Sequence, residues 1–276
     1  MPDTSAHYIH GHHESVLRSH RWRTAANSAA YLLPTIRPGM DLLDVGCGPG
    51  TITLDLARLV APGSVTGIDA VEAPLLAARA DARVQDLGNV SFEVGDVRGL
   101  RFADDAFDIV HAHQVLQHVS DPVAALREMA RVCKPGGSVA ARDSDYAAMT
   151  WFPLDPMLDR WLELYRQTAR ASGGEPDAGR RLLGWAQAAG LADAVASASA
   201  WCYASEQDRL WWGDLWAERV VSSAFAELAL AHGLATRDEL EHISEAWRSW
   251  AAHEDAWFAI LHGEIVCRMP TAPSAS

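Results

Sequence analysis

The sequence lacks several features that mark common protein classes. No apolar run approaches the length of a membrane-spanning helix, and residues 1–5 show no signal-peptide pattern. The four cysteines have no metal-ligand spacing, so we expect free thiols in the cytoplasm and no metal site. The formal net charge of −13 argues against tight binding to a nucleic-acid backbone. We therefore expect no membrane partner and no nucleic-acid partner.

What is present is a chain long enough and apolar enough for a sizeable core, with 276 residues of which 49 % are hydrophobic. Strand and helix patterns alternate from residue 41 to about residue 145. Such alternation predicts βαβ units and a mostly parallel sheet covered on both faces. The predicted strands are 41–46, 64–69, 90–95, 107–112 and 137–143, and the predicted helices are 50–60, 71–86 and 122–133.

A glycine-rich turn follows the first predicted strand, with Gly46, Gly48 and Gly50 at alternate positions. A strand, a tight turn and a helix N-terminus together can cradle a nucleoside-bearing cofactor. The spacing is G-x-G-x-G, whereas turns that wrap a pyrophosphate follow G-x-G-x-x-G. Asp44 precedes the turn, where an acid would repel a pyrophosphate but suits a cofactor that carries an amino-acid cation. Asp69 ends the next strand and can accept hydrogen bonds from both ribose hydroxyls.

These residues resemble the class I S-adenosylmethionine-dependent methyltransferases, within the UbiE-like small-molecule group. The segments 107–110 and 114–118 and the turn at 134–137 extend the resemblance over residues 40–145. It implies a Rossmann-like, doubly wound, seven-stranded sheet whose last strand is antiparallel. We expect three parts: an N-terminal helical lid (1–40), the cofactor-binding core (41–150), and a helical cap with the final strands (151–276).

The resemblance also implies which residues contact S-adenosylmethionine. Asp69 would bind the ribose, Asp96 the adenine amino group, and the glycines the methionine portion, while Cys47 is interpreted as a small filler of the turn. A helix over 14–33 is expected to act as a lid. The predicted cofactor contacts are Asp44, Gly46, Cys47, Gly48, Gly50, Asp69, Ala70, Asp96, Val97, His113, Gln114 and His118, with Tyr8, His12, His20 and Arg23 as lid candidates that could equally be exposed helix residues.

Candidate catalytic residues follow the fourth and fifth strands. His118 could act as a general base at neutral pH or could order the turn before residue 121. Asp143, Asp145 and Tyr146 lie at a strand end, where buried acids are costly unless they are solvated or useful. We therefore expect one of them to orient or deprotonate the methyl acceptor. Arg180 and Arg181 could recognise an anionic substrate or lie over the surface, and Glu264 has no assigned role.

The second half of the chain has a different composition. Ten of the eleven tryptophans lie beyond residue 150. Helical periodicity over 156–172, 179–190, 206–232 and 236–252, with strands over 195–203 and 257–268, predicts a cap above the carboxyl ends of the strands. The tryptophans can fill the seam between cap and sheet, or they can form an aromatic substrate pocket.

The sequence therefore predicts a methyltransferase, a monomer or homodimer, that acts on an O, N or C atom of a small apolar or aromatic molecule of secondary metabolism. A protein that binds the cofactor without transferring methyl would keep the same residues and remains an alternative. A nucleic-acid methyltransferase is disfavoured by the acidic charge, and an arsenic methyltransferase by the scattered cysteines. A nicotinamide dehydrogenase would instead bind NAD tightly.

Overall fold

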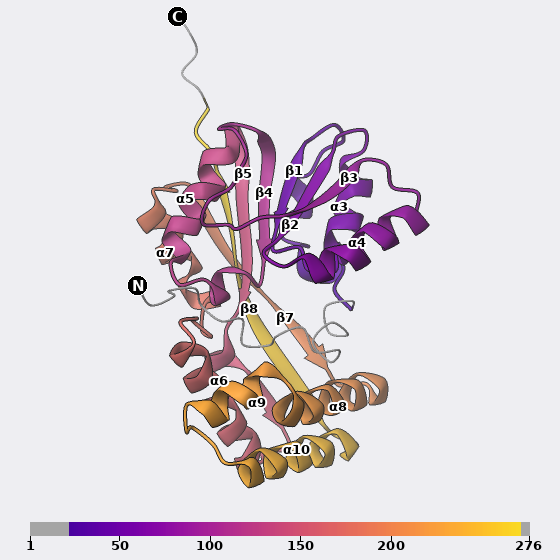
Figure 1. Ribbon diagram of the computed structural model, residues 1–276, viewed down its shortest axis with the longest axis vertical. Coiled ribbons are helices and arrows are strands. Elements are labelled where there is room, and N and C mark those ends of the chain that lie inside the picture. Colours follow the sequence, from indigo (N-terminus) through magenta and orange to yellow (C-terminus); the bar gives the residue numbers. More distant parts are fainter. Residues whose placement is uncertain (1–21, 272–276) are drawn as a thin grey trace, which may run out of the picture.

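A computed structural model describes residues 22–271 (Figure 1), and all the strands in this part of the chain belong to one sheet. The strands are β1 (Leu42–Val45), β2 (Val65–Asp69), β3 (Val90–Val94), β4 (Phe107–His113), β5 (Cys133–Ser144), β6 (Thr150–Phe152), β7 (Ala194–Tyr203) and β8 (Trp257–Arg268). The helices are α2 (Ala25–Ser28), α3 (Thr51–Val60), α4 (Glu72–Val84), α5 (Pro122–Val132), α6 (Pro156–Ala171), α7 (Leu182–Ala189), α8 (Glu206–Ser222), α9 (Ala224–Ala231) and α10 (Arg237–Ala252), with 3-10 turns η1 (Leu33–Thr35), η2 (Leu116–His118), η3 (Tyr146–Ala148) and η4 (Gly179–Arg181).

The sheet has the order β3-β2-β1-β4-β5-β8-β6, and β7 pairs with β8. Strands β1 to β5 run parallel, and β8 is antiparallel to β5, β6 and β7. This confirms the predicted doubly wound sheet with an antiparallel last strand. Strand β6 is an addition to the prediction, because three residues are too few to show an alternating pattern.

Helices cover both faces of the sheet, as βαβ units require. The face that carries Leu42 and Ile109 packs on α3 and on the N-terminal segment around Leu32, and α4 extends this layer over β3. The opposite face, which carries Leu43 and Val110, packs on α5 and α7. Strand β1 is buried along its whole length because it lies between both layers in the middle of the sheet.

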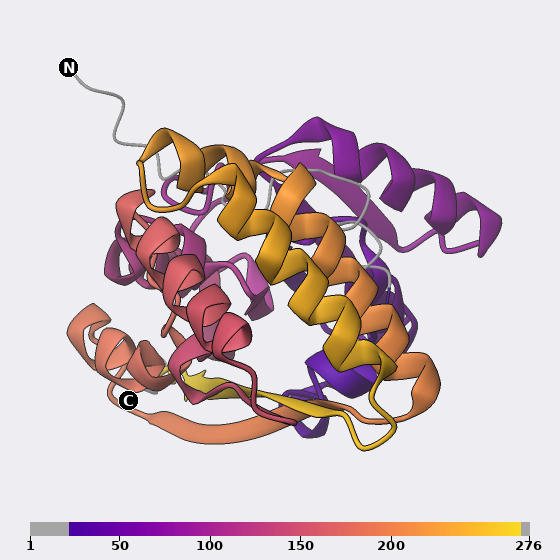
Figure 2. The same cartoon turned by 90° about the horizontal axis from the view of Figure 1, so that it is seen from below.

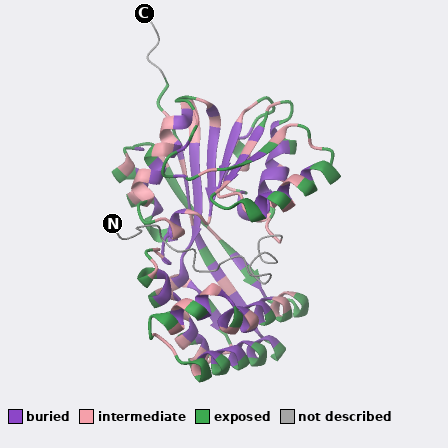
Figure 3. Ribbon diagram, viewed as in Figure 1, coloured by how far each residue is buried: buried purple, intermediate pink, exposed green. Residues whose placement is uncertain are grey.

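The cap consists of α6, α8, α9 and α10, which lie beneath the sheet in Figure 1 and side by side in Figure 2. Each long cap helix begins at a side chain that accepts a backbone N–H: Asp155 for α6, Ser205 for α8 and Thr236 for α10. Strands β7 and β8 extend into the cap, where Phe258 joins its buried core. Buried residues lie on the inward-facing sides of the cap helices as well as along the strands of the sheet (Figure 3).

Two local predictions need correction. The predicted helix over 14–33 is wrong in its described part, where only the four-residue helix α2 forms. The side chains of Thr24 and Asn27 each accept a hydrogen bond from the other's backbone N–H and form a capping box. This cap begins helix α2, so no continuous helix runs through residue 24. Strand β5 begins at Cys133 and includes the predicted turn at 134–137, whereas the predicted strand began at 137. The pairing with β4 changes register in this stretch, which contains Gly136 (φ +76°). Within residues 22–271, no helix has both the length and the apolar character needed to cross a membrane.

Candidate functional site

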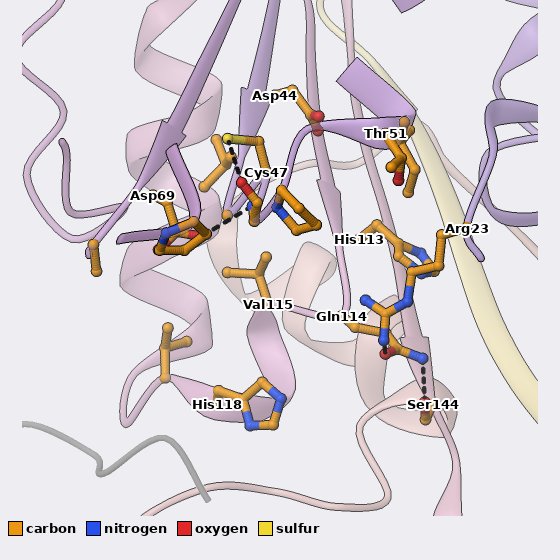
Figure 4. A pocket seen from close by; sticks show the side chains of 18 of the residues that line it. Arg23, Asp44, Cys47, Thr51, Asp69, His113, Gln114, Val115, His118 and Ser144 are labelled. Atoms are coloured by element: carbon orange, nitrogen blue, oxygen red, sulfur yellow. Dashed lines mark hydrogen bonds between the residues drawn. The ribbon is translucent and has the colours of Figure 1, made fainter. Parts of the chain in front are cut away.

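A cavity of about 280 Å³ lies at the carboxyl ends of β1, β2, β4 and β5 (Figure 4). Residues of β7 and α8 line its remaining part. One part, here called the turn half, is lined from segments 44–52, 69–74, 95–98 and 115–120. The other part, the cap half, is lined by Arg23, His113, Gln114, Ser144, Tyr146, Met149, Trp201, Tyr203, Trp211, Trp212, Trp216, Arg219 and Ile260. The two halves belong to one continuous cavity.

The glycine turn has a backbone that other residues rarely adopt. Gly46, Gly48 and Gly50 have φ values of +65°, +54° and +79°. A Cβ on Gly46 would lie 2.4 Å from the Val115 side chain, and one on Gly50 would lie 2.8 Å from the Cβ of Ala78. Both the turn and its packing therefore require glycine at these positions.

Asp69 supports the turn and faces the cavity. One carboxylate oxygen accepts a hydrogen bond from the Gly48 N–H, and the other accepts one from the Val71 N–H, both at 3.0 Å. These two bonds fix the position of the carboxylate next to the turn, and Asp69 lines the cavity. Figure 4 shows Asp69 beside the turn, as a contact to ribose hydroxyls requires.

Asp44 is a buried acid that joins three elements. Its Oδ1 lies 2.8 Å from His111 Nδ1 on β4, and its Oδ2 accepts a hydrogen bond from the Thr53 hydroxyl on α3 at 2.6 Å. These contacts hold the start of the turn between β4 and α3. Asp44 also lines the cavity, so its carboxylate contributes negative charge to that part of it.

Asp96 has a partner that the sequence did not indicate. The Arg98 guanidinium donates to both carboxylate oxygens, and these hydrogen bonds hold the pKa of Asp96 below its ordinary value. Both residues line the cavity, so an adenine amino group would share this carboxylate with Arg98. The contact between Asp96 and adenine stays a prediction.

The chemistry of the turn half fits S-adenosylmethionine. Its described lining includes three carboxylates, Asp44, Asp69 and Asp96, and one guanidinium, Arg98. A pyrophosphate would be repelled there, whereas a ligand with a ribose, an ammonium and a sulfonium matches both the hydrogen-bond acceptors and the charge. The predicted cofactor residues that lie within residues 22–271 all line the cavity except Gly50, which starts α3; Tyr8, His12 and His20 lie outside the described residues.

His118 lines the cavity in a form that does not favour general-base chemistry. The Ser144 N–H donates to Gln117 Oε1, so Gln117 Nε2 must face His118 Nε2, 2.9 Å away, and donate to it. Burial and then the charge of Arg23 lower the pKa of His118 to about 3. The imidazole is therefore neutral near pH 7 and its Nε2 lone pair is occupied, which favours the role of ordering the turn.

Gln114 connects the N-terminal segment to the sheet. Its Oε1 accepts from Arg23 Nη2 at 2.5 Å, and its Nε2 donates to the Ser144 hydroxyl at 2.8 Å and faces His262 Nε2 at 2.9 Å. Since arginine can only donate, this orientation of the amide is determined, and His262 must accept at Nε2. Gln114 holds a left-handed backbone (φ +54°), which directs its side chain to these partners.

Asp143 and Asp145 are both buried, and neither lines the cavity. Asp145 accepts two hydrogen bonds from Arg180, at 2.6 and 2.8 Å, so the buried carboxylate is neutralised by a half-exposed arginine. Asp143 accepts the Gln117 N–H at 3.1 Å, and burial raises its pKa to about 7. The expectation that these acids touch the acceptor is not supported by their positions, because both are bonded behind the cavity wall.

Tyr146 does line the cavity, stacked on Tyr165 with ring centroids 4.0 Å apart, and burial raises its pKa. Of the other candidates, Arg181 pairs with Glu175, and neither Arg180 nor Arg181 lines the cavity.

Glu264 forms a buried ion pair with Arg142 at 3.2 Å. Hydroxyls of β7 also bond to this carboxylate, as a buried charge requires.

Sequence reasoning missed most of the cap half. Trp201 and Tyr203 from β7, Trp212 and Trp216 from α8, and Arg219 line it. The tryptophan enrichment was the available signal, but it could not separate lining residues from packing ones. The structure shows both kinds: Trp161 and Trp247 are fully buried in the cap core and do not line the cavity.

Comparisons with known proteins agree with this geometry. A family model described as a methyltransferase domain matches residues 36–208. The chain is 34 % identical to an uncharacterized methyltransferase of Schizosaccharomyces pombe, covering 96 % of this chain and 97 % of that protein. It is 30 % identical to the probable methyltransferase ltbC of Aspergillus luteorubrus, covering 94 % and 96 %. Its fold is similar to that of the YcgJ protein of Bacillus subtilis, with a TM-score of 0.57, 21 % identity and coverage of 88 % and 98 %.

Proposed function

This chain belongs to the methyltransferase domain family and is an S-adenosylmethionine-dependent methyltransferase, and from that premise we propose that its acceptor is a small aromatic or apolar molecule. The acceptor would bind in the cap half of the cavity. The observation that carries the proposal is the continuity of the cavity from the glycine turn to a chamber of aromatic side chains.

The residues of the turn half would hold the cofactor by the contacts available to them. Asp69 would accept hydrogen bonds from the ribose hydroxyls, Asp44 would attract the ammonium group, and the glycine backbone would contact the methionine portion. When bound, S-adenosylmethionine supplies a methyl group that its sulfonium already activates. The protein's main task is then to position the acceptor and to exclude water.

The cap half is suited to that task. Tyr203, Trp212 and Trp216 are almost fully buried, and Tyr203 stacks on Trp212 with ring centroids 4.3 Å apart and planes 7° apart. Flat, rigid walls of this kind favour a flat, apolar ligand. The methylated atom can be O, N or C, since the aromatic walls do not discriminate among them.

The test is to incubate the purified protein with S-adenosylmethionine and a library of small aromatic and aliphatic compounds. We expect S-adenosylhomocysteine to form only with an acceptor, in equal amount to the methylated product seen by mass spectrometry. Trp212→Ala should lower turnover while binding of S-adenosylhomocysteine, measured by calorimetry, persists. Tight cofactor binding with no transfer to any compound would favour the alternative of a binding protein.

A further inference from the structure

His113 ends strand β4 and lines the cap half of the cavity, with its side chain almost fully buried (Figure 4). Its ring lies 5.7 Å from the Trp201 ring and 6.3 Å from the His262 ring, measured between centroids. Within residues 22–271, neither ring nitrogen of His113 has a hydrogen-bond partner. A buried polar group without a partner is costly, so this imidazole is placed to form hydrogen bonds with a ligand in the cavity.

The neighbouring histidines are bonded within the protein. His118, the other histidine among the described lining residues, accepts a hydrogen bond from Gln117. His262 accepts one from Gln114. In the described part of the chain, His113 is therefore the lining histidine whose two nitrogens are both available to a ligand.

The imidazole of His113 is neutral near pH 7. Burial lowers its pKa well below the ordinary value, and positive charge around it lowers the pKa further. The charged and titratable groups that face it are Arg23 from the segment before α2, His111 from β4, Arg142 from β5 and His262 from β8. A neutral imidazole offers one N–H donor and one lone pair that accepts.

Two more polar groups of the same chamber have no partner within the described residues, the Tyr203 hydroxyl and the Trp212 Nε1–H. Both side chains are buried and line the cap half. Tyr203 lies two residues beyond Trp201 on β7, so it is on the same face of the strand as the ring that packs on His113. The indole N–H can only donate, whereas the tyrosine hydroxyl can donate or accept. The chamber thus combines an accepting lone pair with neutral donors.

A hydroxyl group on the acceptor matches this combination. Its O–H can donate to His113, and its oxygen has two lone pairs. One lone pair can accept from Tyr203 or Trp212, and the other can attack a methyl group. An amine nitrogen has one lone pair, which the attack would use, and a ring carbon has none.

We infer that His113 is a catalytic residue that accepts the proton of an acceptor hydroxyl, so that the protein methylates the oxygen of a phenol. The inference rests on the proposed function, since it concerns the same chamber. The hydroxyl oxygen forms a bond to the methyl carbon, the bond from that carbon to sulfur breaks with its electron pair passing to sulfur, and the hydroxyl proton passes to the imidazole. The oxygen gains positive charge as its new bond forms, so its proton becomes acidic enough for a weakly basic imidazole to take. The imidazolium releases this proton to solvent when the product leaves.

Binding is tested first, by calorimetric titration of the full chain saturated with S-adenosylhomocysteine. The probes are 2-naphthol and 2-fluoronaphthalene, which are similar in shape and differ in the hydroxyl proton. We expect the naphthol to bind about tenfold more tightly. His113→Phe should remove this preference, whereas His113→Gln, whose amide oxygen accepts a hydrogen bond, should retain part of it. His242→Phe is the matched control, since His242 is exposed on helix α10 of the cap, and it should change nothing.

Turnover of 2-naphthol with S-adenosylmethionine separates proton transfer from binding. We expect 2-methoxynaphthalene as the product, and both His113 variants should lower kcat about 100-fold or more, because neither new side chain takes the proton. From pH 7 to pH 9 the rate of the unaltered protein should stay nearly constant, since His113 is already neutral. The rates of the variants should rise by up to about tenfold per pH unit, because the naphthol then ionises unaided. A purely structural role of His113 would not produce this difference.

The inference is overturned if 2-naphthol is not preferred in binding, if it binds but gives no methyl ether, or if both His113 variants keep kcat within about threefold of the unaltered protein. Unchanged binding of S-adenosylhomocysteine shows that a variant is folded. Binding of both probes, weakened by Trp212→Ala, would in these cases leave the proposed function standing. If neither probe binds in a manner sensitive to Trp212→Ala, the proposed aromatic acceptor site fails together with the inference.

Discussion

The two halves of the cavity are built in different ways. The turn half comes from residues 44–120, one stretch of consecutive βαβ units, and it relies on backbone geometry and carboxylates. The cap half is lined by Arg23 and by residues from the ends of β4 and β5 and from β7, α8 and β8. These segments are distant in the sequence, and the cap half relies on aromatic rings and arginines. A cofactor shared by many enzymes can thus be bound by a local motif, whereas the acceptor site depends on how remote segments meet.

The halves are joined by a small polar network. Gln114 and Gln117 both bond to Ser144 at the end of β5, and Asp143 accepts the backbone N–H of Gln117. This network holds η2, which carries His118 into the turn half, beside the strand end that leads to the cap half. We therefore expect a substitution in one half to affect the function of that half alone, unless it also disturbs this network.

The largest effect is expected in the cap. Trp161 is fully buried and packs edge to face on Trp216 and Trp247, with ring centroids 4.6 and 4.8 Å apart. Trp161→Ala should lower the free energy of unfolding by about 3–5 kcal/mol in urea titrations, because it leaves a large cavity. Trp257→Ala, at a tryptophan that is 40 % exposed, is the control and should stay within about 0.5 kcal/mol. If Trp161→Ala also abolishes binding of S-adenosylhomocysteine by folded protein, the halves are not separable.

The next effect is confined to the turn half. Asp69→Ala removes the proposed ribose acceptor and the acceptor of the Gly48 N–H, so the dissociation constant of S-adenosylhomocysteine should rise about 100-fold, or about 3 kcal/mol. Calorimetry measures this, and the affinity for an aromatic probe of the cap half should stay within about twofold. Glu93→Ala, which removes an exposed charge from the neighbouring strand β3, is the control. An equal loss of S-adenosylhomocysteine affinity in that variant would indicate a general effect of charge instead.

The smallest effect concerns the joining network and depends on pH. The pKa of Asp143 is raised to about 7 by burial, above the value of about 3.9 in an unfolded chain. The folded protein thus keeps a proton that the unfolded chain has lost, and the free energy of unfolding falls as the pH rises from about 4 to about 7. Asp143→Asn should remove this contribution to the pH dependence. The free energy of unfolding of the variant, minus that of the unaltered protein, should therefore increase by about 1–3 kcal/mol from pH 5 to pH 8. Urea titrations at pH 5 and pH 8 measure this difference between the variant and the unaltered protein. The same difference at both pH values would contradict this account.

The alternation of patterns was enough to predict the sheet and most helices. The run of Ile52, Leu54 and Leu56 after the glycines predicted α3, whose apolar side chains are buried as expected. The described part of the predicted helix, residues 22–33, was mispredicted because its apolar spacing outweighed the capping pair at Thr24 and Asn27. Strand β6 is defined by its pairing with β8 and has no pattern of its own.

The candidate site divides along the same line. The turn residues could be predicted because a tight turn requires glycine at closely spaced positions of the sequence. The pairing of Arg142 with Glu264 spans 122 residues, and that of Arg180 with Asp145 spans 35. Nothing in the local pattern indicates such partners, so Asp145 resembled a catalytic acid until its arginine was located.

The sequence by itself determined the parallel sheet, the glycine turn and the identity of the methyl donor, because each follows from periodicity, steric limits or charge over a few adjacent residues. Only the tertiary structure decided which tryptophans line the cavity and which fill the cap, and only it placed Arg23 and Arg219 around one aromatic chamber. The reason is physical: burial and charge at the acceptor site arise from contacts between segments that no local pattern relates.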